Sequence, residues 1–426
     1  MIFMKILSKI EPKIYFLMAR YFRFFANRSL KRWNPRVIAI TGSVGKTTLL
    51  HMIELELGQK AHYSHDANSP FGVPFDVLGL KGIKNHRIKW IYLVLSAPLR
   101  SLFYTRKEKF YVVEIDGDRP NGASPLAKWL KPEVTLWVSI GRSHAFRFDQ
   151  EVNEGKFESV DRAIAAEFAT VAENTTKIVY IDADEPLMEE FTKGIKAKVE
   201  KIKKSDIKRY IVYSDSTDFS AGATTFHFAQ PQPRDIAIQL LMLRSLCKYL
   251  KINLKTDFSK MPMPPGRCSF FKGKNGLEII DSSYNAHLSS MKSILEMSKS
   301  LHAPHKWLVI GDIVETGKSE SEEHTKLADL IAEVDAEEII LVGSRTKKYT
   351  APRLKELGLS PKTTLDPKKA LEYIEKRNHG RETLIFKGSQ YLEWIIEQLL
   401  ENPEDAKYLP RRDPAARRRR AKKGLN

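Results

Sequence analysis

The sequence RVIAITGSVGKTTLLHMIELEL at residues 36–57 contains three successive local patterns. An apolar run rich in β-branched residues is followed by a glycine-containing turn and then by an amphipathic stretch from Thr47 to Leu57, which predicts a strand, a loop and a helix. The turn supplies glycines that let backbone amides approach phosphate oxygens, Lys46 for the charge of the β- and γ-phosphates, and the Thr47 hydroxyl for Mg²⁺. A chance glycine-rich turn is the alternative, but the order of these features favours a phosphate loop that binds ATP and Mg²⁺.

Further apolar runs of strand length alternate with helical patterns along the rest of the chain. They cover residues 111–115, 134–138, 178–181, 307–310, 339–342 and 383–386. Continuous apolar strands alternating with helices are typical of a mostly parallel sheet with helices on both faces. We therefore predict an α/β protein, with a P-loop central domain built on a mostly parallel sheet and a smaller, Rossmann-like α/β C-terminal domain.

Length, charge and proline content indicate how the chain is divided. Its 426 residues are enough for two or three domains, and the proline-rich stretch 261–266 marks a stiff connector. The formal charge of +18 is concentrated at the ends, because residues 1–34 carry eight Lys/Arg against one Glu and residues 403–426 carry nine against three acids. We predict an amphipathic basic helix at 1–34, a central ATP-binding domain at 35–261, a C-terminal domain at 262–400 and a disordered basic tail at 401–426.

Short segments spread over residues 41–389 resemble, in order, the motifs of the Mur ligase family, the ATP-dependent amide ligases of cell-wall peptide assembly. The loop Thr41-Gly42-Ser43-Val44-Gly45-Lys46-Thr47-Thr48 resembles the family's TGxxGKTT. The other matching segments are residues 68–74 (NSPFGVP), 113–115 (VEI), 139–144 (SIGRSH), 266–267 (GR), 281–286 (DSSYNA), 311–317 (GDIVETG) and 386–389 (FKGS). Each match alone is weak, but their co-linear order argues against coincidence.

The resemblance implies an ADP-forming ligase that converts a substrate carboxylate into an acyl phosphate, which the amine of an amino acid or dipeptide then attacks in cell-wall peptide synthesis. It assigns the nucleotide phosphates to residues 41–48. The remaining roles that it implies are metal binding for Thr47, Glu114 and His144, catalysis for Lys46, His144 and Lys387, and nucleotide binding for Arg267, Asp281 and Asn285. From spacing alone, Glu114 and Lys387 could instead be solvated strand-end residues, Asn285 a turn residue and His324 a surface helix residue.

Two departures from the family pattern concern the metal and the substrate. The lysine that the family carries after the motif histidine, carbamylated in the folded enzyme, has no counterpart between Phe157 and Thr176. Lys156, Glu158 or Glu167 could replace its carboxylate. Only residues 1–35 precede the first strand, too few for the UDP-sugar-binding domain of the member that adds D-alanyl-D-alanine. We therefore expect either a UDP-linked or a lipid-linked cell-wall peptide precursor.

A second apolar stretch with basic flanks covers residues 89–99 (KWIYLVLSAPL). Together with residues 1–34 it could form an interfacial patch on an anionic membrane. The alternative, which we favour, is that the two segments pack on each other or on the body. Because the sequence offers neither a membrane span nor a cleavage site, and its two cysteines fit a reducing compartment, we predict a cytoplasmic protein, peripheral at the inner face of the membrane at most.

Two hypotheses from other functional classes stay open at this point. A P-loop ATPase associated with nucleic acid would use the basic tail to neutralise phosphates, although no nucleic-acid-binding motif accompanies the tail, and we expect no nucleic-acid partner. A non-catalytic scaffold would bind ATP without turnover. The partners that we expect are therefore ATP, the peptide precursor and an amino acid or dipeptide.

Overall fold

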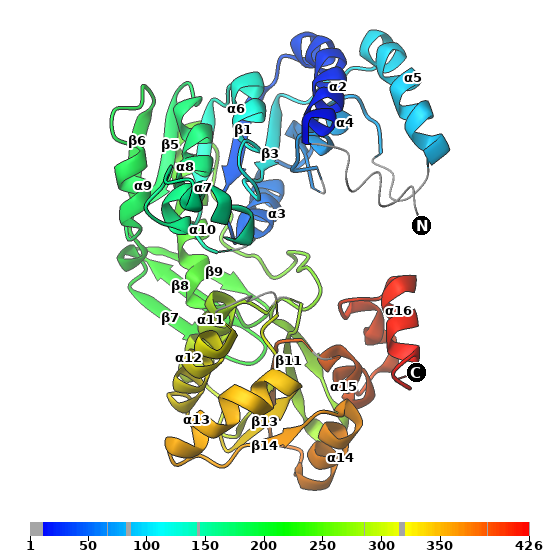
Figure 1. The fold of residues 1–426 in the computed structure, drawn as a ribbon. Helices are drawn as coiled ribbons and strands as arrows, with labels where there is room; N and C mark the ends of the chain where they lie inside the picture. The colour runs from blue at the N-terminus through cyan, green and yellow to red at the C-terminus, as the bar shows by residue number, and fades with distance from the viewer. Residues whose placement is uncertain are drawn as a thin grey trace. The chain divides into compact units, whose positions relative to one another are not determined.

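The computed structural model describes residues 12–65, 67–81, 87–142, 145–284, 286–314, 320–389 and 391–425 (Figure 1). The chain forms two compact units. The first comprises Met1–Lys204 and Ile238–Leu254, and the second comprises Ser205–Ala237 and Lys255–Asn426. The division differs from the predicted boundary at residue 262, because residues 205–237 pack with the C-terminal part of the chain. Proline punctuation marks where regular structure stops, whereas packing decides which segments fold together.

The first unit contains a six-stranded sheet in the order β2-β3-β1-β4-β5-β6, and every pair of neighbouring strands is parallel. The strands are β1 (Arg36–Thr41), β2 (Ala61–Tyr63), β3 (Phe110–Ile115), β4 (Val134–Trp137), β5 (Ile178–Asp182) and β6 (Lys198–Ile202). The central strands β1, β3, β4 and β5 are buried along almost their whole length, as expected for a parallel sheet covered on both faces. The predicted α/β fold is confirmed.

Helices cover both faces of this sheet. The helices are α2 (Pro12–Trp33), α3 (Lys46–Leu57), α4 (Gly72–Val77), α5 (Arg87–Phe103), α6 (Ser124–Leu130), α7 (Asp149–Asn153), α8 (Val160–Glu173), α9 (Pro186–Phe191) and α10 (Ala237–Leu250). Val37, Ala39 and Val113 contribute to a core with α2, α4, α5 and α6, and α8 and α9 continue this layer over β4 and β5. On the opposite face α3 lies against β1 and β3, and Tyr180 of β5 donates a hydrogen bond to the Ser245 carbonyl of α10.

The N-terminal helix α2 packs on α4 and α5, which confirms the favoured alternative for the two apolar segments. The Phe22 side chain is fully buried, with its ring centroid 4.7 Å from that of Phe75 and 6.3 Å from that of Trp90. Tyr21 donates a hydrogen bond to the Val94 carbonyl. No helix among the described residues is both long enough and apolar enough to cross a membrane.

The second unit contains two sheets. A three-stranded antiparallel sheet consists of β7 (Arg209–Val212), β8 (Thr217–Ala221) and β9 (Thr224–Phe228). A six-stranded sheet has the order β10-β11-β15-β12-β13-β14, in which only the β10–β11 pair is antiparallel. Its strands are β10 (Ser269–Lys272), β11 (Glu278–Ser282), β12 (Lys306–Gly311), β13 (Glu338–Val342), β14 (Lys362–Thr364) and β15 (Thr383–Lys387).

Helices α11 (Leu288–Ser300), α12 (Glu320–Ala332) and α13 (Ala351–Glu356) cover one face of the larger sheet. Helices α14 (Pro367–Arg377) and α15 (Leu392–Leu399) cover the other. Leu308 and Leu341 point to the first layer and Val309 and Ile340 to the second, because successive side chains of a strand alternate between faces.

The prediction of a disordered tail at 401–426 is wrong for the described residues. They form a 3₁₀ helix, η8 (Pro403–Tyr408), and an α-helix, α16 (Pro414–Ala421). Leu409 and Leu425 belong to the same buried core as α14 and α15. Composition alone concealed this order, because two leucines inserted into a core formed by distant residues offset the entropy of ordering a largely charged segment.

Candidate functional site

The predicted phosphate loop connects β1 to α3 in the first unit. Gly42 and Gly45 have φ angles of 128° and 89°, a region that side-chain-bearing residues rarely adopt. Neighbouring groups also lie close to the Cα atoms of both glycines. A Cβ atom on Gly42 would lie 2.8 Å from the Ser139 backbone, and one on Gly45 would lie 2.0 Å from Nε2 of Gln239 in α10. Both glycines are therefore required by backbone conformation and by space.

Lys46, the first residue of α3, is only 8% exposed. Its ammonium group donates a hydrogen bond to the Gly42 carbonyl and lies 3.3 Å from Oδ1 of Asp116, which follows β3. The side chain thus folds back over the loop that precedes it. A nucleotide phosphate bound at the loop would meet a lysine already held at the helix N-terminus, where backbone amides and the helix dipole also favour an anion.

Thr47 and Glu114 supply neighbouring oxygen atoms. The Thr47 hydroxyl donates a weak hydrogen bond of 3.4 Å to Oε2 of Glu114, which lies near the end of β3 and is 2% exposed. The backbone amide of Glu114 donates to Oγ of Ser64, at 2.9 Å. A hydroxyl and a carboxylate are the hard oxygen ligands that Mg²⁺ prefers, so these two side chains fit a magnesium ion at the phosphate loop.

Three residues to which the sequence analysis gave no role support the loop. Oγ of Ser139, just after β4, accepts a hydrogen bond from the Val44 amide and donates one to the Val44 carbonyl, both at 2.8 Å. Asp116 faces Lys46, and Gln239 covers Gly45. Ser139 starts a segment with family resemblance and so carried a signal, whereas Gln239 lies nearly two hundred residues away in an ordinary helix pattern and carried none.

The second unit brings Arg267, Asp281 and Lys387 to one corner of its larger sheet. Asp281 of β11 and Lys387 of β15 lie near the ends of adjacent parallel strands, with Ser282 in register with Lys387. The Arg267 guanidinium lies over the Tyr284 ring, 5.3 Å from its centroid. Oδ1 of Asp281 accepts a hydrogen bond of 2.9 Å from the Ser283 amide.

Burial dominates the electrostatics of this corner. It lowers the pKa of Lys387 to about 8, against the opposing charges of Cys268 and Asp281, and raises the pKa of Asp281 to about 6. It also raises the pKa of the Cys268 thiol to about 11. A buried ammonium whose charge is costly gains most from an anionic ligand, so Lys387 is suited to contact a phosphoryl or carboxylate group.

Residues 266–390 match the model of the Mur ligase family described as the glutamate ligase domain. The UDP-N-acetylmuramoyl-tripeptide--D-alanyl-D-alanine ligase of Bacillus subtilis is 24% identical over 388 residues, covering 89% of this chain and 79% of that protein. The protein of the same name in Rickettsia prowazekii is 25% identical over 374 residues, covering 84% of this chain and 77% of its own. The chain is thus similar to Mur ligases in sequence, and the family-model match lies in its C-terminal part.

Solved structures extend the Mur ligase likeness to the whole fold. MurF from Thermotoga maritima in complex with ADP superimposes with a TM-score of 0.69 at 18% identity, covering 91% of this chain and 84% of that chain. A MurF structure from Acinetobacter baumannii gives a TM-score of 0.67 at 20% identity, covering 89% and 79%. At these identities the likeness concerns the fold.

The predicted site residues fall into two groups. Residues 41–48 and Glu114 meet in the first unit, and Arg267, Asp281 and Lys387 meet in the second. His144 and Asn285 lie outside the described residues. The catalytic, nucleotide and metal roles of all these residues remain predictions.

The three candidates for replacing the family's carbamylated lysine have other partners. Glu167 of α8 is 8% exposed, and its two oxygens accept hydrogen bonds from the Asn121 and Ala123 amides at 2.8 and 2.7 Å. Lys156 pairs with Glu154 at 2.9 Å on the surface. Glu158 is 86% exposed beside Arg162. Glu167 therefore fixes the loop before α6, which is a structural role.

His324 is buried rather than on the surface of α12, so that interpretation is wrong. Its side chain is fully inaccessible, and Nδ1 lies 2.9 Å from Oγ1 of Thr350. Burial lowers the pKa of His324. The reason for the error is that α12 packs against the segment that leads into α13, where Thr350 lies. A histidine can be buried there because its ring nitrogen pairs with the Thr350 hydroxyl.

A further group of metal-ligand side chains comprises His51 and Glu54 of α3 and His65, which follows β2. His51 Nδ1 lies 3.3 Å from Oε2 of Glu54, and His65 Nε2 lies 3.4 Å from Oε1 of the same residue. One ligand atom from each residue lies within 4.8 Å of the other two. Imidazole and carboxylate groups suit zinc and related cations, although the ion pairs already satisfy Glu54.

Proposed function

We propose that this chain is an ATP-dependent, ADP-forming ligase that joins a carboxylate to an amine in cell-wall peptide synthesis. Its relatives in Bacillus subtilis and Rickettsia prowazekii are named as ligases of UDP-N-acetylmuramoyl-tripeptide and D-alanyl-D-alanine. The observation that carries the proposal is the phosphate loop, where Lys46 and the Thr47–Glu114 pair stand at the N-terminus of α3. This arrangement suits the β- and γ-phosphates of ATP together with one magnesium ion. The Mur ligase domain match in the second unit points to the same class of reaction.

The residues of the first unit bind and orient the nucleotide. Lys46 and the loop amides stabilise the negative charge on the β- and γ-phosphates, while Thr47 and Glu114 would hold Mg²⁺, which withdraws charge from the transferring phosphoryl group. A carboxylate oxygen of the acceptor attacks the γ-phosphorus, and ADP leaves. The amine nitrogen then attacks the acyl carbon, phosphate leaves, and the nitrogen loses a proton.

Lys387 and Arg267 of the second unit supply positive charge in this proposal. Acyl-phosphate formation and breakdown both concentrate negative charge around one carboxylate, so fixed cations stabilise these steps more than covalent catalysis would. The lowered pKa of Lys387, about 8, means that an anionic group beside it would restore a stable ammonium form.

The proposed acceptor is a muramoyl-peptide precursor, UDP-linked or lipid-linked, and the proposed amine is an amino acid or dipeptide such as D-alanyl-D-alanine. Purified protein with ATP and Mg²⁺ should release ADP and phosphate only when acceptor and amine are both present, and mass spectrometry should find the condensed product. The Lys46→Met variant serves as the inactive control. ATP hydrolysis that ignores both substrates, or is stimulated by nucleic acid instead, would contradict the proposal.

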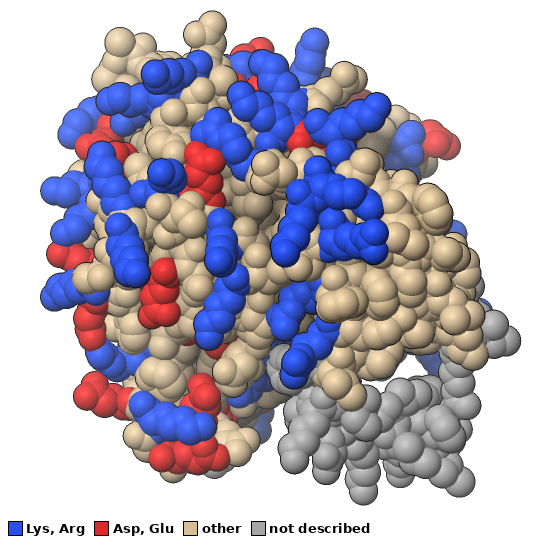
Figure 2. Space-filling view, turned by 90° about the horizontal axis from the view of Figure 1, so that it is seen from above, with Lys and Arg blue, Asp and Glu red and all other residues tan. Residues whose placement is uncertain are grey.

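We further propose that α5 contacts the membrane surface. Ile91, Leu95, Leu99 and Phe103 recur at four-residue spacing and are 63%, 66%, 60% and 84% exposed, so they form an apolar stripe on the side of α5 that α2 leaves uncovered. Viewed from above, Figure 2 shows uncharged surface bordered by Lys and Arg side chains on this face of the molecule. Apolar side chains flanked by cations suit the interface of an anionic bilayer.

Cosedimentation with vesicles of phosphatidylglycerol and phosphatidylcholine tests this contact. The double variant Leu95→Asp/Leu99→Asp should lose vesicle binding and keep ligase activity on soluble substrates. The matched control is Leu357→Asp/Leu365→Asp, which places the same two negative charges on exposed leucines of the second unit. Equal binding by both variants would rule out α5 as the membrane contact.

A further inference from the structure

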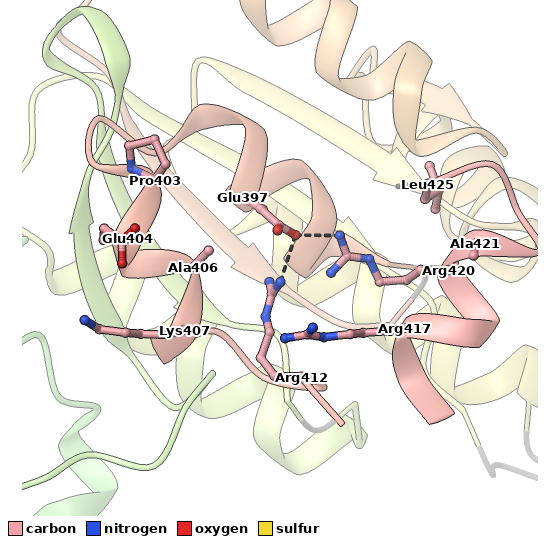
Figure 3. Close-up of a pocket in the computed structure, with 10 residues that line it drawn as sticks. All are labelled: Glu397, Pro403, Glu404, Ala406, Lys407, Arg412, Arg417, Arg420, Ala421 and Leu425. Carbon is pink, nitrogen blue, oxygen red and sulfur yellow. Dashed lines mark hydrogen bonds and ion pairs between the residues drawn. The ribbon is translucent and has the colours of Figure 1, made fainter. Parts of the chain in front are cut away.

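A pocket of about 600 Å³ lies in the second unit, where α15, η8 and α16 meet (Figure 3). Its lining consists of Glu397 and residues between Pro403 and Leu425. None of them belongs to residues 266–390, which match the Mur ligase domain, and none has a role in the proposed reaction. The pocket therefore requires an explanation of its own.

The lining carries an excess of positive charge. Four cationic side chains face two carboxylates, namely Lys407, Arg412, Arg417, Arg420, Glu397 and Glu404. In Figure 3 the Arg412 and Arg420 side chains converge on Glu397, and Arg417 extends from α16 toward Arg412. Two guanidinium groups thus contact one carboxylate, and a third guanidinium lies beside them.

Glu397 cannot neutralise the arginines around it. A single oxygen, Oε2, accepts hydrogen bonds from both Arg412 Nη1 at 2.9 Å and Arg420 Nη2 at 2.5 Å. Burial opposes ionisation of Glu397, but these two arginines outweigh it and lower the pKa of Glu397. One negative charge is therefore shared by two buried or half-buried positive charges, with Arg417 close by.

Several N–H groups of these arginines have no acceptor within the described part of the chain. They are Nε and Nη2 of Arg412 and Nε of Arg420, all of them inaccessible to solvent. The Arg420 side chain as a whole is 7% exposed. Buried donors are nearly always hydrogen-bonded in folded proteins, and the planar guanidinium fork matches the oxygens of phosphate or carboxylate.

The pocket wall is held in place by its own anchors. Asp413 caps α16, because its Oδ1 accepts hydrogen bonds from the Ala415 and Ala416 amides at 3.0 Å. Leu409 before the helix and Leu425 after it are buried in the core of the unit. The arginines of α16 are thus presented by a fixed helix, and preorganised donors bind an anion without a large ordering cost.

We propose that this pocket binds a small phosphorylated ligand, whose phosphoryl oxygens take hydrogen bonds from Arg412, Arg417 and Arg420. The volume of about 600 Å³ is large enough for a phosphoryl group with a substituent. Two sources share this chemistry, a soluble phosphate ester and a phospholipid headgroup, and the experiment separates them.

Isothermal titration calorimetry of inorganic pyrophosphate with the full-length Lys46→Met variant reports on this pocket while binding at the phosphate loop is weakened. Adding Arg417→Gln or Arg420→Gln should weaken binding at least about tenfold, the effect expected for loss of one charge-assisted pair. The matched control is Arg418→Gln, which removes the same charge from an exposed position of α16 outside the pocket lining. Arg417 is itself exposed, so its substitution spares the buried contacts of Arg420.

The outcomes distinguish this proposal from the ligase function. No pyrophosphate binding in the Lys46→Met background, or equal affinity of Arg417→Gln and Arg418→Gln, would overturn the pocket and leave the ligase proposal intact. In a parallel arm with phosphatidylglycerol vesicles, a loss specific to Arg417→Gln assigns the phosphate to a lipid headgroup, and a loss in solution alone assigns it to a soluble ligand. Oligonucleotide binding weakened equally by both variants would mean a diffuse basic surface, against the proposal.

Discussion

The buried ionisable side chains of the two units have different surroundings. In the first unit Lys46 has the Gly42 carbonyl and the Asp116 carboxylate beside it, and Glu167 accepts two backbone amides. In the second unit burial dominates the surroundings of Lys387 and Asp281 and shifts the pKa of each toward its neutral form. At the phosphate loop, protein groups thus pair with the lysine ammonium. At the Lys387 corner, an anionic ligand would be needed to stabilise the charged form of the lysine.

The largest expected effect comes from the lysine that the first unit holds ready. Lys46→Met removes the ammonium closest to the proposed phosphate position, and we expect kcat/KM for ATP-dependent ligation to fall by about 1,000-fold. A phosphate-release assay measures this loss. Lys60→Met, on an exposed residue at the end of the same helical segment, should stay within about twofold. Comparable losses in both variants would mean that the loop does not hold the phosphates.

Lys387→Met sharpens the contrast because activity and stability should move in opposite directions. We expect kcat/KM to fall about 100-fold, while the free energy of unfolding at pH 7 rises by up to about 3 kcal/mol, because a buried ammonium has been removed. In the wild type the unfolded lysine holds its proton more tightly than the native one, so stability should rise between pH 8 and 10.5.

Urea melts of wild type and Lys387→Met across this pH range measure the difference. The variant should show no such rise, and Lys369→Met, an exposed lysine of α14, should behave like the wild type. A stability difference between wild type and Lys387→Met that stays constant from pH 8 to 10.5 would contradict a destabilised ammonium.

Asp281 predicts a second pH dependence, of opposite sign. Its native pKa of about 6 lies above the usual value of 3.8, so the native state binds the proton more tightly. The contribution of Asp281 to stability is then fully present below pH 4 and is lost as the pH rises through 6, by up to about 3 kcal/mol. Asp281→Asn should remove this part of the pH profile in thermal melts, whereas Asp335→Asn, at an exposed position, should not.

The smallest expected effect is a loss of stability at Glu167. The Glu167 carboxylate accepts hydrogen bonds from two backbone N–H groups, and Glu167→Gln places a side-chain NH₂ group against one of them. We therefore expect a loss of about 2 kcal/mol in the free energy of unfolding. The exposed Glu158→Gln should change it by less than about 0.5 kcal/mol. If Glu167 were instead a metal ligand, its substitution would raise the Mg²⁺ concentration needed for activity and leave the apo protein equally stable.

Local patterns predicted the phosphate loop and the α/β fold because each depends on residues close together in sequence. The GSVGKTT turn needs its own glycines and the adjacent strand and helix, and β1 to α3 follow from them. The contact of Gln239 with Gly45 was not predictable from the sequence. The apolar pattern of a helix does not indicate which distant loop a polar residue of that helix will contact.

The tail shows the same limit for charged sequence. Arg411, Arg412 and Arg420 pair with Glu393 and Glu397 on α15, so part of the predicted free charge is compensated by acids that lie in another helix. Composition correctly located the positive charge at the end of the chain. It could not reveal the carboxylates and the leucine contacts that order it.

The return of α10 to the first unit has a consequence for how the protein is made. The phosphate loop is synthesised early, yet Gln239 and the helix that covers the loop emerge only after residues 205–237, which belong to the second unit, have been translated. A nascent chain or recombinant fragment that stops at Lys204 therefore exposes the face of β5 that α10 covers. Neither unit corresponds to a continuous stretch of the gene, so a fragment that includes all of the first unit must extend through Leu254.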